Sequence, residues 1–281
     1  MKAIKLASVF AVSAVAAAVS TTTFAAEPVF TGTAGLEYKA TEADGGDAAQ
    51  SRGEVNIIGD TGLVYFDVDM EGQSTEGGNG TTAFQLDEIY VKQGAVSFGD
   101  FDGSIADDAA FSAGVEEDKD GAKQTLDTDL AIRYAVMPGL TVAAEMTEGS
   151  SQTSVAAKYT QDLGVATLGL SGALGLGTDA DNQVVTVGVS VPAGMATISA
   201  FYETGKIADA DVNNFGAGLD LALTEAVTAA FQYYNQDEID DSGIIEGTVY
   251  YTSGDLTYYV SYLDYEANDK DYSLVGAKAS F

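Results

Sequence analysis

Residues 185–191 read Val-Thr-Val-Gly-Val-Ser-Val, a stretch in which every second residue is a valine and the residues between are small or polar. Side chains of a β-strand point alternately to opposite faces, so this period of two predicts a strand with one apolar and one polar face. The same alternation recurs along the chain, for example at 29–39, 63–72 and 213–223. The sequence therefore predicts an all-β protein.

Sixteen segments of this kind are separated by residues that favour turns. We expect strands at 29–39, 52–59, 63–72, 83–93, 95–101, 127–136, 140–148, 153–161, 165–175, 184–192, 195–205, 213–223, 227–236, 244–253, 256–266 and 272–281. Closed bacterial barrels have an even number of antiparallel strands of about ten residues, with alternating hydrophobicity. A soluble β-sandwich would give the same alternation, but here the apolar face persists along the whole chain. We therefore expect a transmembrane antiparallel β-barrel.

The expected connections alternate between tight turns and longer segments, the asymmetry that outer-membrane barrels have between their two ends. Turns such as 59–62 and 93–94 are short, whereas connections such as 40–51 and 206–212 are longer and rich in Asp, Gly or Asn. No proline interrupts an expected strand. The short turns would lie on the periplasmic side and the longer segments on the outer side.

The first residues have the layout of a secretory signal peptide. Lys2 and Lys5 precede an apolar run of about 14 residues, and Thr23-Phe24-Ala25 follows as a small-x-small site. The run is shorter than the roughly 20 residues of a membrane-spanning helix. We expect residues 1–25 to be removed on export and residues 26–281 to form the barrel.

Composition excludes several functions. The chain has no Cys and no His, which removes disulfides, thiolate metal sites and the usual general base, so we expect no enzyme. The net charge is −31 and becomes −33 when Lys2 and Lys5 are lost, so nucleic acid is not an expected partner. Calcium at acidic runs such as 209–211 or 237–241 is an alternative, but neither run has the spacing of a dedicated site, and we expect no cofactor.

Three stretches resemble the general porins of Gram-negative bacteria. Residues 51–63 are similar to the second strand and turn of these proteins, residues 87–103 to the fourth and fifth strands, and Phe281 to their terminal aromatic residue. The resemblance covers the whole mature chain. It implies a homotrimer of sixteen-stranded barrels in outer-membrane lipid, each a water-filled channel for passive diffusion of small hydrophilic solutes and ions.

Residues 102–126 form the longest expected connection and follow the fifth strand. About 25 residues without strand alternation are uncommon unless the segment has a function. In the general porins the loop at this place folds into the barrel, so the resemblance implies a pore-constricting loop; an outer surface loop is the alternative. Only Lys119 and Lys123 stand against its acidic residues. These are Asp102, Asp107, Asp108, Glu116, Glu117, Asp118 and Asp120.

In the family, arginines on the facing wall oppose the acidic loop. Arg52 and Arg133 have inward parity at matching places, whereas the arginine often found on the fourth strand is missing. The expected inward bases are Lys39, Arg52, Arg133, Lys158 and Lys278. The expected inward acids are Glu37, Glu54, Asp67, Asp69, Glu71, Asp129, Glu145, Glu203, Asp220 and Glu246. Because charges lining a narrow water path bias the local ion concentration, we expect a cation-preferring channel.

Three residues of the fourth strand raise a question. Regular alternation places Glu88, Tyr90 and Lys92 on the lipid face, where a charge is costly. Either a neighbouring subunit covers Glu88 or a bulge turns it inward, and the sequence leaves both readings open.

Two other functions are alternatives to passive diffusion. A sugar-selective channel would need an aromatic path in the lumen, but the inward aromatics are scattered in sequence. They are Tyr65, Phe201, Tyr234, Tyr250 and Tyr259. A structural or adhesive barrel would act through its outer loops, which are short after residue 148.

Overall fold

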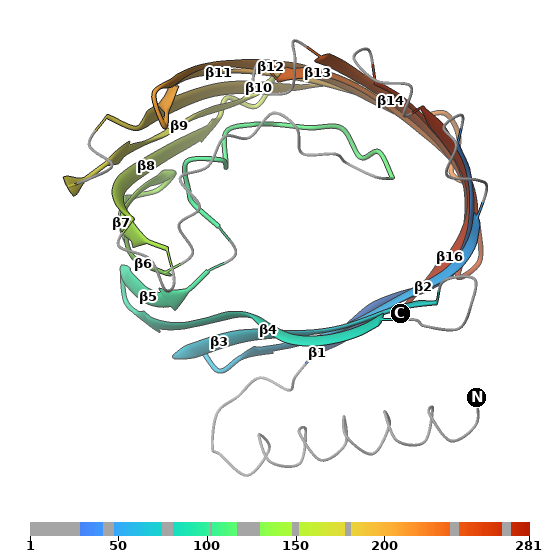
Figure 1. Cartoon of the computed structure of the whole chain (residues 1–281), viewed down its shortest axis with the longest axis horizontal. Helices are drawn as coiled ribbons and strands as arrows, with labels where there is room; N and C mark the ends of the chain where they lie inside the picture. Colours follow the sequence, from blue (N-terminus) through green and yellow to red (C-terminus); the bar gives the residue numbers. More distant parts are fainter. Residues whose placement is uncertain are drawn as a thin grey trace.

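Sixteen strands form one closed barrel in the computed structural model (Figure 1). The structure describes residues 29–41, 48–74, 81–101, 103–116, 130–147, 152–177, 181–236, 242–265 and 271–281. The expected signal peptide lies outside these residues. No helix in the described ranges is long and apolar enough to cross a membrane.

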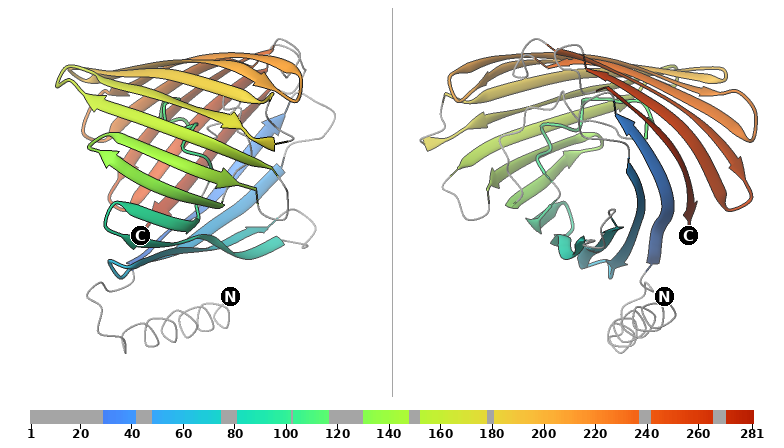
Figure 2. Two further views of the ribbon diagram at one scale, coloured as in Figure 1. Left: turned by 90° about the vertical axis from the view of Figure 1, so that its left-hand side faces the viewer. Right: turned by 45° about the vertical axis from the view of Figure 1, so that its right-hand side comes forward.

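Each strand pairs antiparallel with its neighbours in sequence, and β1 pairs with β16 to close the sheet. The strands run obliquely around the barrel (Figure 2). Every one of the sixteen expected segments overlaps an observed strand, so the predicted fold class is confirmed. The strands are β1 (Val29–Thr41), β2 (Ala48–Asp60), β3 (Val64–Ser74), β4 (Thr81–Gln93), β5 (Val96–Asp100), β6 (Leu130–Met137), β7 (Leu140–Met146), β8 (Thr153–Asp162), β9 (Thr167–Gly175), β10 (Gln183–Ala193), β11 (Ala196–Ile207), β12 (Ala210–Ala222), β13 (Val227–Gln236), β14 (Ser242–Ser253), β15 (Leu256–Tyr265) and β16 (Tyr272–Ser280).

The apolar face of the sheet is turned outward. Leu36 and Val187 are 64% and 52% exposed, while the adjacent polar residues Glu37 and Thr186 are 2% and 0% exposed. A soluble sandwich would bury the apolar face and expose the polar one. This arrangement therefore excludes the sandwich and fits a barrel whose outer surface meets lipid.

The C-terminal residue completes the closure between β1 and β16. Phe281 and Gly32 exchange two backbone hydrogen bonds, each 3.0 Å long. The Phe281 ring occupies the space beside Gly32, because a Cβ added at this glycine would lie 2.7 Å from the ring. The terminal aromatic residue thus packs on a strand from the opposite end of the chain.

A β-bulge in β4 settles the orientation of its charged residues. Asp67 of β3 pairs with Glu88, but the next residue, Val68, pairs with Leu86, so Asp87 is an extra residue in the ladder. The bulge reverses the alternation on its C-terminal side. Glu88 and Lys92 therefore face inward together with Tyr90.

The outward orientation that regular alternation predicts for Tyr90 is wrong. Its ring stacks between Tyr65 and Phe101, at centroid distances of 4.8 and 4.4 Å. Lys92 lies beside the same stack, with Nζ 5.0 Å from the centre of the Tyr65 ring, and it binds Asp60 at 2.8 Å.

The connection between β11 and β12 is shorter than predicted. The sequence predicts a connecting segment over 206–212, but only Ala208 and Asp209 separate the two strands. Their φ angles are 50° and 70°. Two consecutive residues with positive φ form a tight hairpin turn that matches the twist of the strands, and this is why the strands extend into the expected loop.

Candidate functional site

A segment without regular secondary structure lies inside the barrel (Figure 1). Its described part, residues 103–116, follows β5 and is called the inner segment below. Buried backbone N–H and C=O groups need hydrogen-bond partners. Most hydrogen-bond partners of the segment's backbone outside the segment are side chains of the inner wall. These side chains hold the segment in place.

The beginning of the inner segment is bound by Glu145 of β7. This carboxylate is 3% exposed and accepts hydrogen bonds from the Ser104 hydroxyl at 2.6 Å and from the Ile105 N–H at 3.1 Å. Farther along, the hydroxyl of Ser171 in β9 donates to the Ala106 carbonyl. Hydrogen bonds to a charged acceptor are stronger than neutral ones, so Glu145 is the main anchor at this end.

Arg133 of β6 supports the same end from the other side. Its Nη2 donates to the Gly103 carbonyl at 2.7 Å, and its guanidinium lies 3.8 Å above the Phe101 ring. Because Phe101 is stacked on Tyr90, the arginine continues the aromatic column of β3 and β4. Planar guanidinium groups stack well on aromatic rings. Arg133 thus helps to hold the start of the inner segment through this hydrogen bond and this stacking contact.

The end of the inner segment is bound by β12 and β13. The Ala113 N–H donates to Oε1 of Gln232 at 2.9 Å, and the Gly114 N–H donates to Oδ1 of Asp220 at 2.8 Å. These two wall side chains accept from the N–H groups of two successive residues. They fix the height at which the segment crosses this part of the wall.

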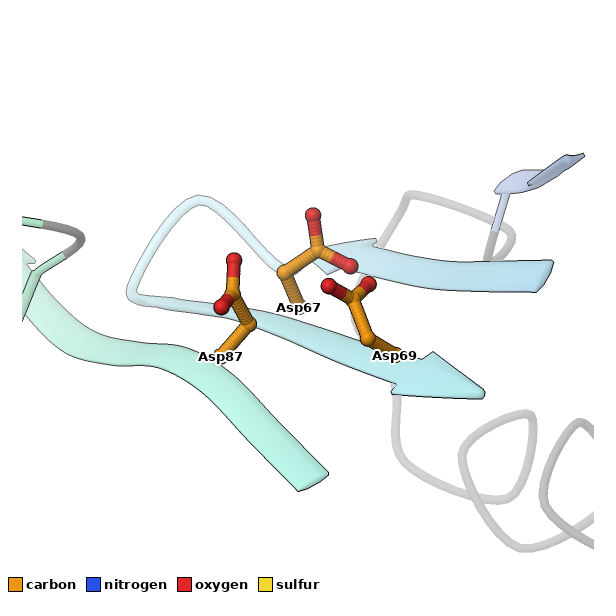
Figure 3. A group of neighbouring side chains, drawn as sticks. All are labelled: Asp67, Asp69 and Asp87. Atoms are coloured by element: carbon orange, nitrogen blue, oxygen red, sulfur yellow. The ribbon is translucent and has the colours of Figure 1, made fainter. Parts of the chain in front are cut away.

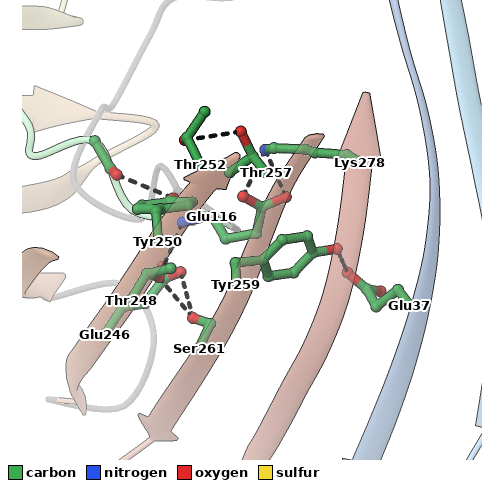
Figure 4. A network of polar contacts seen from close by, with 11 residues as sticks. Glu37, Glu116, Glu246, Thr248, Tyr250, Thr252, Thr257, Tyr259, Ser261 and Lys278 are labelled. Carbon is green, nitrogen blue, oxygen red and sulfur yellow. Dashed lines mark hydrogen bonds and ion pairs between the residues drawn. The ribbon is translucent and has the colours of Figure 1, made fainter. Parts of the chain in front are cut away.

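The last described residue of the segment, Glu116, reaches β14 and β16 (Figure 4). Its N–H donates to the Thr248 hydroxyl at 3.2 Å, and its carboxylate binds the Lys278 ammonium at 2.6 and 2.8 Å. The Tyr250 hydroxyl donates to the Gly114 carbonyl at 3.1 Å. The Glu116 side chain is 8% exposed and the Lys278 side chain 31%, so the carboxylate is the shielded partner of this ion pair.

Glycines of the inner wall allow the middle of the segment to approach closely. A Cβ added at Gly188 of β10 would lie 1.9 Å from the Ala109 carbonyl oxygen. A Cβ at Gly169 would meet Ala109 at 3.1 Å, and one at Gly218 would meet the Ala113 nitrogen at 2.9 Å. These three glycines form a seat that a larger side chain would fill.

The structure brings part of the predicted site together. Lys158 binds Asp108, and Lys278 binds Glu116, so two wall lysines meet two acids of the inner segment. Lys39 instead lies over the Tyr272 ring, with Nζ 3.3 Å from its centre.

Other predicted residues fall outside this cluster. Glu54, Asp67 and Asp69 lie on β2 and β3, as do the backbones of Arg52 and Glu71. Arg52 pairs with Gly35 of β1. Asp107 lies in the inner segment, where its N–H donates to the Ser104 carbonyl at 3.3 Å. The other predicted residues lie outside the described part of the chain; they are Asp102, Glu117, Asp118, Asp120 and Asp129.

Sequence reasoning missed the residues that hold the segment by hydrogen bonds. Gln232 and Thr248 are uncharged residues with inward parity, and nothing in the sequence distinguishes them from other polar wall residues. The bulge at Asp87, by contrast, could have been predicted from the sequence. The outward residues Phe84 and Leu86 are followed by Ile89, so the spacing changes from two to three at the bulge.

Four of the five inward aromatics, although scattered in sequence, lie together in space, while Tyr65 stacks on Tyr90 elsewhere on the wall. Phe201, Tyr234 and Tyr259 belong to one cluster, and Tyr250 packs against it. The three are 8%, 1% and 6% exposed. The rings of Phe201, Tyr234 and Tyr259 are packed against protein, so these three offer no exposed aromatic surface to a sugar.

Comparison with known proteins identifies the fold. No family model and no curated protein matches the sequence. Among solved structures, a mutant of Rhodobacter blastica porin matches with a TM-score of 0.63 and 15% identity, over 90% of this chain and 100% of that one. An OmpT variant of Vibrio cholerae without loop L8, described as an outer membrane protein, matches with a TM-score of 0.60 and 15% identity, over 90% and 99%. Salmonella typhi OmpF in complex with daunomycin matches with a TM-score of 0.61 and 14% identity, over 91% and 98%. The chain therefore has the barrel fold of the porins.

Proposed function

We propose that this chain forms a water-filled channel for passive diffusion of small hydrophilic solutes and ions, with a preference for cations. The observation that carries the proposal is the closed sixteen-stranded barrel with an apolar outer face and a polar inner face. Barrels of this size leave an aqueous channel, whereas eight-stranded ones are filled by side chains. The inner segment would narrow that channel.

Wall lysines offset two of the acids of the inner segment. Asp108 and Glu116 of the inner segment are paired with wall lysines, and Arg133 is bound to the segment's backbone. Each of the two ion pairs cancels its own charge, whereas the Arg133 guanidinium, which donates to a neutral carbonyl, keeps its positive charge. The acids of the inner segment therefore contribute less net charge to the lumen than their number in the sequence implies.

The opposite part of the wall is acidic. Figure 1 places β3 and β4 across the ring from β12 and β13. Where the resemblance to general porins leads one to expect arginine on the fourth strand, the bulge instead turns Glu88 inward beside Asp67. Together with Asp69 and Glu54, these carboxylates would attract cations to this side of the water path.

The exposed apolar belt supports a location in outer-membrane lipid, because so large an apolar surface is not stable in water. The homotrimer is proposed from the resemblance to general porins. Chemical cross-linking of the protein in mild detergent, followed by mass determination, would test it.

Conductance in a planar bilayer tests the function. The refolded chain should give stepwise currents, and a KCl gradient should give a reversal potential of the sign that cation preference requires. Asp67→Asn with Asp69→Asn should reduce this potential, whereas Asp211→Asn, an exposed carboxylate near the β11–β12 turn, should leave it unchanged. An anion-preferring current would contradict the charge argument. A folded barrel without current would contradict the channel and favour a structural or adhesive role.

A further inference from the structure

A hollow of about 360 Å³ lies in the inner wall where the end of the inner segment meets β10 to β14. Figure 1 shows these strands side by side. Ligand pockets usually measure roughly 300–1,000 Å³, so the hollow has room for a small solute. Ala222 and Thr228 of its lining are exposed, so a solute in the lumen can reach it.

Among the described residues that line this hollow, Asp220 of β12 is the one that carries a charge. Its Oδ1 accepts the Gly114 N–H at 2.8 Å, and it takes part in none of the ion pairs of the described residues. Lys278 lies nearby, with Nζ 5.8 Å from the centre of the Tyr250 ring, but Glu116 neutralises it. The hollow therefore favours a positively charged group.

Hydroxyl groups flank this carboxylate. Thr197 of β11 is the direct cross-strand partner of Asp220, and Thr228 of β13 lies opposite Ala222, the next residue of β12 on the same face. Side chains directly opposite each other have Cβ atoms about 5 Å apart. An ammonium group has three N–H donors, so beside Asp220 it can donate to the carboxylate and to the Thr197 hydroxyl.

The rest of the lining offers apolar surface. Ala230 of β13 pairs with Asp220 from the other side, Ala222 follows it on β12, and the Tyr250 ring closes the hollow on β14. Small side chains at these positions leave space for an alkyl chain, which loses contact with water there. We propose that this hollow binds a small organic cation, a primary ammonium ion with a short alkyl chain. The ammonium group lies at Asp220 and Thr197, and the chain lies over the alanines and the ring.

Other charged parts of the inner wall differ from this site. A hollow of about 340 Å³ over β4 to β8 is lined by Lys92, Arg133 and Lys158, with Glu88 as its acid, and would repel such a cation. Figure 3 shows the aspartates of β3 and β4, which line neither hollow. They attract cations of every kind, so the test must separate a site at Asp220 from this general effect.

Saturation-transfer NMR with n-butylammonium chloride tests the site. The refolded full chain in detergent would be titrated with the probe, and protein-free micelles would give the background. We expect saturable transfer to the butyl protons, with an affinity at least tenfold above that of 1-butanol. Ammonium chloride should compete at least tenfold more weakly than the probe. Equal affinity of butanol, or equal competition by ammonium, would overturn the proposal.

Variants of the lining locate the binding. Asp220→Asn keeps an oxygen that can accept from Gly114 but removes the charge, and it should weaken binding at least tenfold. Ala222→Leu should fill the hollow and weaken binding several-fold. Glu225→Gln, at an exposed carboxylate of the β12–β13 turn outside the lining, should not change it.

Unchanged affinity in Asp220→Asn would overturn the proposal. An equal loss of affinity in Asp67→Asn with Asp69→Asn would also overturn it, because the general attraction of the lumen would then account for the binding. Heat-modifiable gel mobility would verify folding, and Ala222→Leu decides the outcome if Asp220→Asn does not fold.

This inference deepens the proposed function, on which it rests only for the path of the solute along the lumen. Binding in detergent is measured without conduction. Currents without saturable transfer would refute the site and leave the channel intact. Transfer without currents would refute the channel and leave the site intact.

Discussion

Replacing Gly188 by alanine tests how closely the inner segment fits its seat. The added Cβ would lie 1.9 Å from the Ala109 oxygen and 2.9 Å from the Phe111 ring. Real Cβ contacts are essentially never shorter than 3.0 Å. The segment must therefore move away from β10 by about 1 Å or more. Backbone shifts that overpacking causes lower the stability of the folded protein.

Two effects should follow from this displacement. Overpacking of this kind typically costs about 1–3 kcal/mol, which urea unfolding in the presence of lipid vesicles would measure. Because the wall lies on one side of the segment and the lumen on the other, the retreat is directed into the lumen. The single-channel conductance of Gly188→Ala should therefore fall below that of the parent protein.

Gly53→Ala is the matched control. Among the described residues, a Cβ at Gly53 would meet only the Thr33 oxygen, at 3.8 Å, an ordinary contact. Both stability and conductance should stay near the parent values. If Gly188→Ala also leaves both unchanged, the inner segment does not rest on β10 as described.

Three further outcomes are expected. Lys278→Met should leave the shielded Glu116 carboxylate without its ammonium partner and raise the cation preference, and Glu116→Gln in addition should return the reversal potential toward the parent value. Removing Phe281 deletes two backbone hydrogen bonds to Gly32, so the barrel should unfold at a lower temperature in a gel-shift assay. Deleting Asp87 should leave a folded barrel, because β4 without its extra residue alternates regularly; circular dichroism and gel mobility would show whether it does.

The alternation of apolar and polar residues was sufficient to predict the barrel. One face of nearly every strand is apolar, and a slip of one residue would turn that face toward water in the lumen. Leu36 beside Glu37 and Val187 beside Thr186 follow this rule. The rule fails where the ladder contains an extra residue, and this is why regular alternation predicts the wrong face for Tyr90.

The position of the inner segment could not be predicted from residues alone. Asp108 and Lys158 are 50 residues apart, and Glu116 and Lys278 are 162 apart. Which acid meets which lysine depends on the path of the chain across the lumen. That path is set by close approach to Gly188 and by wall side chains such as Gln232, whose roles appear only in three dimensions.

The attachments of the inner segment have a mechanical consequence. It is fastened to β7 and β9 at one end and to β12, β13, β14 and β16 at the other. The wall of a thin-walled barrel is easily deformed. A segment bonded to separated parts of the wall resists this deformation. The segment thus acts as a cross-brace against the lateral pressure of a bilayer. A variant with a shorter segment would have a wider bore and a softer cross-section together, so bore and rigidity cannot be adjusted independently in this barrel.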